Sequence, residues 1–281
     1  GAVVTSSLPC VSVQASADDL YTSPGDYEVT FDRTLISSLS ISLADTVSSF
    51  TSRGPVIAAG GNLQLKPDVA PPGDLIFSAA SGTGTEGVFL GGTSMAAPHV
   101  AGVAAVLHQA YPSYTPQQIK SLIMNTATND LWTGNNQTGD NFAPPRIGAG
   151  RVDVLNALQH RALAYSSSNP EGVSVSFGVI NAINPGTVSQ NITVENTSSI
   201  RLTYNALYTS YLDMNGATIS VSPARISLQP GETAEVTVTL TYDPTQMDEN
   251  SLVDPTMSTT QATGFGTLPR NWHREESGYV T

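Results

Sequence analysis

The feature that most constrains the fold is a run of small and apolar residues that begins just after residue 94. Residues 89–110 read FLGGTSMAAPHVAGVAAVLHQA, and few polar side chains occur after Ser94. A surface helix carries one apolar stripe, whereas a helix that is apolar all round belongs in a protein interior. We therefore predict a helix over 95–110 that is buried on all sides in an α/β core, with Ser94 at its N-terminal end.

Two further helices are predicted before residue 160. The segment TPQQIKSLIMNTA (115–127) has Thr115 as N-cap, Pro116 at the first helical position and Gln118 closing a capping box. One face of this helix is predicted to carry Ile119, Leu122, Ile123 and Thr126. The segment GAGRVDVLNAL (148–158) predicts a short third helix that carries Val152, Leu155 and Leu158.

From about residue 161 the apolar residues follow a period of two, which is typical of strands. In ETAEVTVTL (232–240), the side chains of Ala234, Val236, Val238 and Leu240 are expected on one face, and those of Glu235, Thr237 and Thr239 on the other. Short alternating strands separated by turns predict a β-sandwich. The fold class expected is α/β followed by an all-β sandwich.

Charge and composition exclude several classes of function. The net charge is −12, and Lys66 and Lys120 are the only lysines. Such a chain repels nucleic acids and anionic membranes, and no apolar run is long enough to span a bilayer. Cys10 has no second cysteine to pair with and reads as a small buried residue. The oligomeric state stays open.

Three glycosylation sequons suggest a secreted glycoprotein. They lie at Asn136, Asn191 and Asn196, in a lysine-poor, Ser/Thr-rich, acidic chain. Two other patterns read as loops. Gly82, Gly84 and Gly87 match a dinucleotide-binding fingerprint but precede a β-like segment rather than a helix. The carboxylates of Asp243, Asp248, Glu249 and Asp254 lack the glycine and spacing of a calcium loop and predict a solvated acidic loop. No cofactor or metal site is identifiable.

The residues around Ser94 are typical of those around a nucleophilic serine. A serine hydroxyl needs a base to take its proton and donors to hold the oxyanion that forms. A helix N-terminus offers free backbone N–H groups, and Gly91 and Gly92 let a substrate backbone come close. Residues 89–110 taken alone also allow a structural interpretation, in which the segment is a core helix of small residues that begins with a capping Ser-Thr pair.

Four blocks, in order, resemble the subtilisin-like serine proteases. GTSMAAPHVAG (92–102) resembles their nucleophile motif, SSFTSRGP (48–55) resembles SSFSSRGP, and LKPDVAPPG (65–73) resembles LKPDVAAPG. The two segments predicted to be helical, 111–127 and 148–158, match the helices that close the catalytic domain. Pro71 and Gly91 depart from the usual alanine and serine. The resemblance implies peptide-bond hydrolysis with Ser94 as nucleophile and protein or peptide substrates.

The same resemblance implies a domain order. Residues 1–45 look like the tail of an inserted protease-associated domain, and 46–160 like the C-terminal half of the parallel-sheet catalytic domain. Residues 161–250 resemble the fibronectin type III-like domain of large extracellular members, and 251–281 the segment that follows it. The chain is accordingly expected to be a C-terminal fragment.

The partners of Ser94 are the missing part of this resemblance. The family's triad runs Asp, His, Ser along the chain, but no histidine precedes residue 94. His99 lies five residues later, about 140° around the helix, and is predicted to be structural. Asp68 reads as a loop-anchoring carboxylate, and Asn62 as part of a variable loop rather than the oxyanion-hole asparagine. The fragment alone is therefore predicted to be inactive.

Two rival functions stay open at this point. An α/β-hydrolase would place its acid and histidine after the serine, where Asp153 and His160 occur. A non-catalytic protein could also keep the subtilase fold as a binding or structural module. Asp and His motifs in the coding sequence upstream would distinguish the protease from the module.

Overall fold

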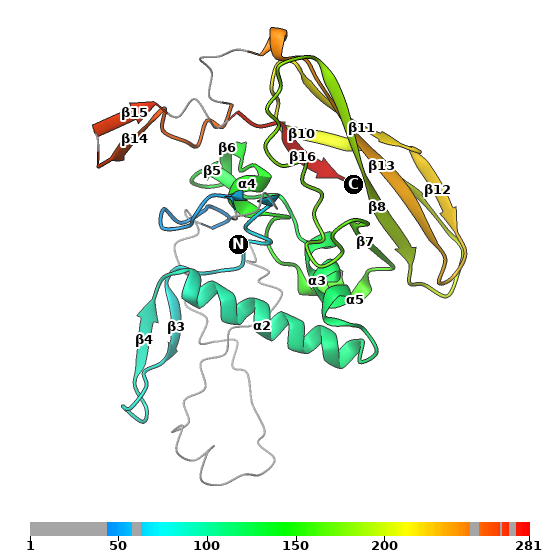
Figure 1. Cartoon of the computed structure of the whole chain (residues 1–281). Coiled ribbons are helices and arrows are strands. Elements are labelled where there is room, and N and C mark those ends of the chain that lie inside the picture. The colour runs from blue at the N-terminus through cyan, green and yellow to red at the C-terminus, as the bar shows by residue number, and fades with distance from the viewer. Residues whose placement is uncertain (1–43, 58–62, 248–252, 265, 270–273) are drawn as a thin grey trace.

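The computed structural model describes residues 44–57, 63–247, 253–264, 266–269 and 274–281. A helical part lies beside a β-rich part, and the chain's last strand runs between them (Figure 1). The segment 1–43, which includes Cys10, lies outside the described residues, as do Asn62, Asp248 and Glu249.

The helical part is built on three helices that share one core. These are α2 (Thr93–Ala110), α3 (Pro116–Asn125) and α5 (Val154–Gln159), with the short helix α4 (Pro144–Ile147) before α5. Their common core contains Val103, Leu107, Ile119, Leu122, Ile123, Val152, Val154, Ala157 and Leu163. The face predicted for α3 is confirmed, because Ile119, Leu122, Ile123 and Thr126 are all at most 7% exposed.

The predicted capping box of α3 is also confirmed. The Thr115 side chain accepts a hydrogen bond from the Gln118 backbone N–H at 3.2 Å, and the Gln118 side chain accepts one from the Thr115 backbone N–H at 3.0 Å. The third helix differs in detail from its prediction. Helix α5 begins at Val154, so Val152 precedes it, and Leu155 is 59% exposed rather than packed.

Helix α2 is only partly buried, which corrects the prediction of burial on all sides. Val103 and Leu107 are buried, but the small residues Ala97, Ala101 and Ala105 are exposed. One side of the helix packs on α3 and α5, and the described residues do not cover the other side. No helix in the described part of the chain has both the length and the apolar character needed to cross a membrane.

The strands of the helical part form antiparallel pairs. They are β1 (Val56–Ile57) with β2 (Leu63–Gln64), β3 (Ile76–Ala79) with β4 (Gly87–Leu90), and β5 (Trp132–Gly134) with β6 (Thr138–Asn141). The predicted parallel sheet does not appear among the described residues, where parallel pairing is limited to bridges between Thr46 and Trp132 and between Ala70 and Arg151. A parallel sheet requires neighbouring strands joined by crossovers, whereas each of these strands pairs with one close to it in sequence.

The β-rich part contains a four-stranded antiparallel sheet and smaller ribbons. The sheet has the order β11 (Ala217–Ser222), β13 (Thr233–Tyr242), β8 (Gly186–Asn196), β7 (Ala162–Ser166). The ribbons pair β9 (Leu202–Asn205) with β12 (Arg225–Leu228), β10 (Tyr208–Leu212) with β16 (Ser277–Val280), and β14 (Thr260–Thr263) with β15 (Gly266–Pro269). The alternation predicted for β13 is confirmed, because Val236, Val238 and Leu240 are buried while Glu235 is exposed.

Replacing Val236 by aspartate should destabilise this sheet strongly. Val236 is 1% exposed on a strand that pairs on both sides, so Val236→Asp places an unpaired charge in the core at a cost of about 2–4 kcal/mol. Hydrogen exchange of the β13 amides should accelerate accordingly. Thr241→Asp, at an exposed position of the same strand, is the control. Equal exchange in the two variants would show that the strand register is wrong.

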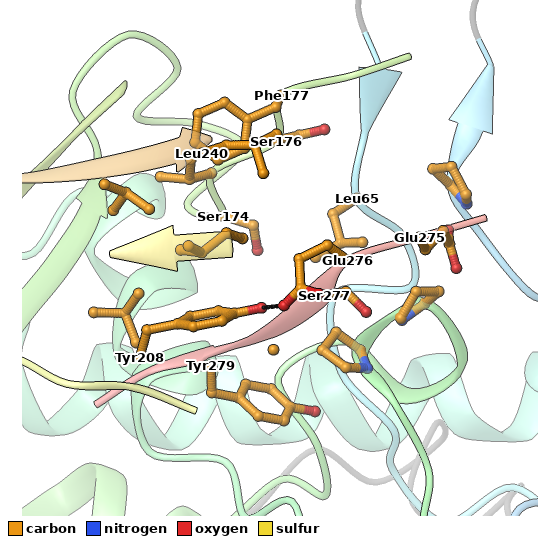
Figure 2. Close-up of a pocket in the computed structure, with 18 of the residues that line it drawn as sticks. Leu65, Ser174, Ser176, Phe177, Tyr208, Leu240, Glu275, Glu276, Ser277 and Tyr279 are labelled. Carbon is orange, nitrogen blue, oxygen red and sulfur yellow. Dashed lines mark hydrogen bonds between the residues drawn. The ribbon is translucent and has the colours of Figure 1, made fainter. Parts of the chain in front are cut away.

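Strand β16 links the β-rich part to the helical part. It pairs with β10, and the hydroxyl of Tyr279 donates a hydrogen bond to the carbonyl of Gly148 at 2.9 Å. A cavity of about 1180 Å³ lies at this junction (Figure 2). Glu276 on its wall accepts hydrogen bonds from the hydroxyls of Tyr208 and Ser210, both at 2.9 Å. Burial and the neighbouring Glu276 carboxylate raise the pKa of Tyr208, so this phenol stays protonated and can donate.

A buried ion-pair network crosses the same junction. Arg53 donates through Nε to Asp254 at 2.8 Å and through Nη2 to Glu275, and both Arg53 and Asp254 side chains are at most 7% exposed. The prediction that Asp254 belongs to a solvated acidic loop is therefore wrong. The neighbours of Asp254 in the sequence are acidic and suggest a solvated loop, whereas its partner Arg53 lies 201 residues away.

Candidate active site

Ser94 is the second residue of α2 and lies at the N-terminal end of this helix. It is exposed, and neither its hydroxyl nor its backbone N–H has a hydrogen-bond partner among the described residues. Gly92, two residues before Ser94, has φ 155°, a conformation that residues with a Cβ rarely adopt. This backbone leaves the Ser94 side chain accessible and provides a free donor beside it.

The loops around Ser94 are held by close backbone contacts between the sequence blocks that resemble the subtilases. The N–H of Gly92 donates to the carbonyl of Gly73 at 2.7 Å, and a Cβ on Gly73 would lie 3.1 Å from that of Ala96. The N–H of Gly54 donates to the carbonyl of Pro145 at 2.8 Å, and a Cβ on Gly54 would collide with the carbonyl of Lys66. Three of the blocks identified in the sequence, 48–55, 65–73 and 92–102, thus meet in one place.

Asp68 anchors one of these loops. Its carboxylate pairs with Lys66 at 2.5 Å and with Lys120 of α3 at 3.4 Å, and its carbonyl accepts the N–H of Ala149 at 2.9 Å. The predicted role of Asp68 as a loop anchor agrees with these contacts. Both lysines of the chain are engaged in this one cluster.

Among the described residues, no histidine is hydrogen-bonded to Ser94. The Nδ1 atom of His99 lies 2.8 Å from the carbonyl of Met95 within the same helix. His160 follows α5, and its neighbour Leu158 accepts a hydrogen bond from Tyr111, at the far end of α2, at 2.6 Å. Ser94 and Tyr111 are separated by seventeen helical steps, or about 25 Å.

The α/β-hydrolase alternative is therefore excluded for these residues. His160 lies near the opposite end of α2 from Ser94, and burial lowers its pKa. Asp153 is the N-cap of α5 and accepts the N–H of Asn156 at 3.0 Å, so its carboxylate has a structural role. Among the described residues, no hydrogen bond joins the Ser94 hydroxyl to a histidine or a carboxylate.

The glycine pattern at 82, 84 and 87 is a hairpin turn. Gly82 and Gly84 have φ of 79° and 81° and lie between β3 and β4, so a strand rather than a helix follows. No group of three or more His, Cys, Asp or Glu side chains with metal-binding geometry occurs among the described residues. The junction cavity is lined by other residues than Ser94 and is a separate feature.

The three sequons differ in accessibility. Asn136 is exposed in the β5–β6 turn, and Asn191 is half-buried with its amide donating to Glu235 at 2.9 Å. Asn196 is 0% exposed, and its amide nitrogen donates to the carbonyls of Ile200 and Leu228 at 2.8 and 3.0 Å. A glycan on Asn196 is incompatible with this packing, so this candidate site is wrong for the folded chain.

The similarity of this chain to known proteins includes the sequence blocks described above. The family profile described as Subtilase family (Peptidase_S8) matches residues 7–150, which is half of the chain. The chain belongs to the subtilase family. This subtilase chain is 33% identical over 223 residues to the minor extracellular protease Vpr of Bacillus subtilis, covering 76% of the chain and 25% of Vpr.

Other relatives show the same partial coverage. Identity is 40% over 136 residues with the subtilisin-like protease SBT1.9 of Arabidopsis thaliana, covering 44% of the chain and 17% of the relative. It is 32% over 249 residues with the PI-type proteinase of Lactococcus lactis subsp. cremoris, covering 75% and 12%. The chain thus spans a quarter or less of these relatives.

Solved structures add little to this assignment. Fervidolysin from Fervidobacterium pennivorans aligns with a TM-score of 0.23 at 18% identity, covering 56% of the chain and 34% of fervidolysin. The serine protease of Aeromonas sobria aligns with a TM-score of 0.25 at 16% identity, covering 70% and 42%. The family assignment rests on sequence.

Proposed function

We propose that this chain is the C-terminal part of a secreted serine endopeptidase in which Ser94 is the nucleophile. The hydroxyl attacks the scissile carbonyl, and the acyl-enzyme that forms is then hydrolysed by water. The triad Asp and His and the oxyanion-hole asparagine would come from a preceding part of a longer protein. The substrates are proteins or peptides.

The observation that carries this proposal is the placement of Ser94. It is exposed at the N-terminus of a helix, with a free hydroxyl and a free N–H among the described residues, in the block that resembles the subtilase nucleophile motif. The relatives add support, because Vpr, SBT1.9 and the PI-type proteinase are all named as proteases, and Vpr as extracellular.

The domain arrangement is part of the same proposal. Residues 46–160 would complete a subtilisin-like catalytic domain, and 161–250 would form a fibronectin type III-like β-sandwich on it. Support comes from the antiparallel sheet of β11, β13, β8 and β7 with its buried face. Residues 1–45 would return from a protease-associated insert, and 251–281 would begin the following segment.

A fluorophosphonate probe tests the role of Ser94. Such probes phosphonylate activated serines, so the longer protein should give one adduct, mapped by peptide mass spectrometry to Ser94. Ser94→Ala should abolish labelling and peptidase activity together. Labelling of another serine, or none in a protein with the upstream Asp and His motifs, would refute the assignment.

The alternative is a binding or structural module with a subtilase fold. It predicts an intact upstream coding sequence without the family's Asp and His motifs, and no probe adduct. The exposed hydroxyl of Ser94 favours the protease, because Gly92 is the N-cap of α2 and Ser94, two residues later, is open to a substrate.

A further inference from the structure

A carboxylate occupies the space where a side chain of residue 91, three residues before the candidate nucleophile, would otherwise lie. Residue 91 is glycine, and a Cβ built there would lie 2.6 Å from Oδ1 of Asp74 and 3.7 Å from the ring of Phe50. Gly91 is three residues before Ser94. The absence of a side chain at Gly91 is therefore what allows Asp74 to take this position.

Asp74 is held in place from two sides. Its Oδ1 accepts the N–H of Leu75 at 2.9 Å, and its Oδ2 lies 3.4 Å from the hydroxyl of Ser48, which donates to it. The preceding residue, Gly73, is itself bonded to Gly92 at 2.7 Å. The carboxylate thus belongs to the same loop contact that positions the start of α2.

The charge of Asp74 is uncompensated within the described residues. Its side chain is exposed and makes no ion pair there, whereas both lysines are engaged by Asp68. The ring of Phe50 beside it is 46% exposed. An open carboxylate next to an open aromatic face suits a lysine or arginine side chain, whose stem packs on apolar surface while the cation meets the carboxylate.

The position limits which substrate residue can reach Asp74. Three residues of extended chain span at most about 10 Å, and this is the greatest separation of Gly91 from Ser94. Because Asp74 lies against the space at Gly91, its distance from Ser94 is at most roughly this span plus the length of one contact. An extended substrate advances about 3.3 Å per residue. The residue that reaches Asp74 is therefore within about three positions of the scissile bond.

We propose that Asp74, lodged in the space that Gly91 leaves open, is a specificity-determining residue that favours peptides with lysine or arginine within three residues of the cleaved bond. This inference rests on the proposed protease function. An exposed ion pair of this kind corresponds to about a two- to fivefold preference in kcat/KM.

The test compares peptides that differ at one position. The longer protein is assayed with fluorogenic peptides that carry lysine, glutamine or glutamate at each of the three positions on either side of the cleaved bond. At one position the wild type should prefer lysine to glutamine about two- to fivefold, and 0.5 M NaCl should reduce the preference. Asp74→Asn, which keeps the hydrogen-bonding shape, should remove it, and Asp74→Lys should reverse it towards glutamate.

Two further variants separate charge from position. Glu86→Gln removes one negative charge from the β3–β4 turn and should leave the preference unchanged. Gly91→Ser keeps all charges but places an atom against Asp74, so it should weaken the preference. Titration with the fluorophosphonate probe corrects each rate for the amount of folded active site.

Each outcome decides the inference. If the protein hydrolyses the peptides but Asp74→Asn leaves every lysine-to-glutamine ratio of kcat/KM unchanged, the specificity role of Asp74 is overturned and the proposed function is not. Absence of any hydrolysis that depends on Ser94 overturns both the proposed function and this inference. A preference lost in Asp74→Asn and kept in Glu86→Gln supports it.

Discussion

Purified on its own, the 281-residue chain should hydrolyse peptides no faster than its Ser94→Ala variant. No histidine precedes Ser94, and His99 and His160 are held elsewhere, so we expect the described part of the chain to offer no group that takes the serine proton or protonates the leaving amine. In subtilisin, loss of the serine or the histidine costs about 2 × 10⁶ in kcat. Absence of the oxyanion asparagine should cost a further factor of about 10²–10³.

Cleavage of fluorescent casein measures this prediction. The chain and its Ser94→Ala variant are compared at equal concentration, because traces of contaminating protease would raise both equally. Turnover that depends on Ser94 would show that a base such as His160 reaches it after all. The exposed side of α2 also predicts poor solubility of the chain alone, since Ala97, Ala101 and Ala105 would stay in contact with water.

Local patterns in the sequence were sufficient for the parts of the fold that depend on local rules. The capping box of α3 and the buried face of β13 follow from residues that are neighbours in the chain, and both are confirmed. The position of Ser94 at the start of a helix follows in the same way. The composition of α2 predicts a helix that needs cover on all sides, and the described residues supply that cover on one side only.

Contacts between distant segments were the other part that the sequence did not reveal. Asp254 looked like one of several solvated acids, yet it is buried against Arg53. The Asp74 carboxylate was overlooked because its significance comes from the missing side chain at Gly91. Asn196 satisfies a sequon, but two hydrogen bonds bury its amide. In each case the deciding partner lies outside the local pattern.

Replacing Arg53 by methionine in this chain should lower the free energy of unfolding by about 3–5 kcal/mol. The change leaves the carboxylate of Asp254, which is 3% exposed, and that of Glu275 without their shared cation. The control Lys66→Met breaks a pair whose side chains are 34% and 28% exposed, where the cost should be about 1 kcal/mol or less. Thermal or denaturant unfolding gives both values.

Acid should reduce the difference between wild type and Arg53→Met. Burial alone would raise the pKa of Asp254, but hydrogen bonds from Thr256 and Arg53 hold it below its ordinary value of 3.8. In the wild type this carboxylate stabilises the fold above that pH, and the contribution is lost as the pH falls through the lowered pKa. Without Arg53 the buried carboxyl protonates at higher pH, which relieves the unpaired charge.

The loss caused by Arg53→Met should therefore be largest near pH 7 and smaller near pH 4. The direction in which this loss changes with pH distinguishes a broken charge pair from a change in packing. If methionine at residue 53 acted only by changing packing beside Gly54 and the loop that leads to Ser94, the loss would be the same at both pH values, because no ionisable group would be left without its partner. A pH-independent loss would thus show that the buried charge pair does not hold the segment around Asp254 to Arg53 in the helical part.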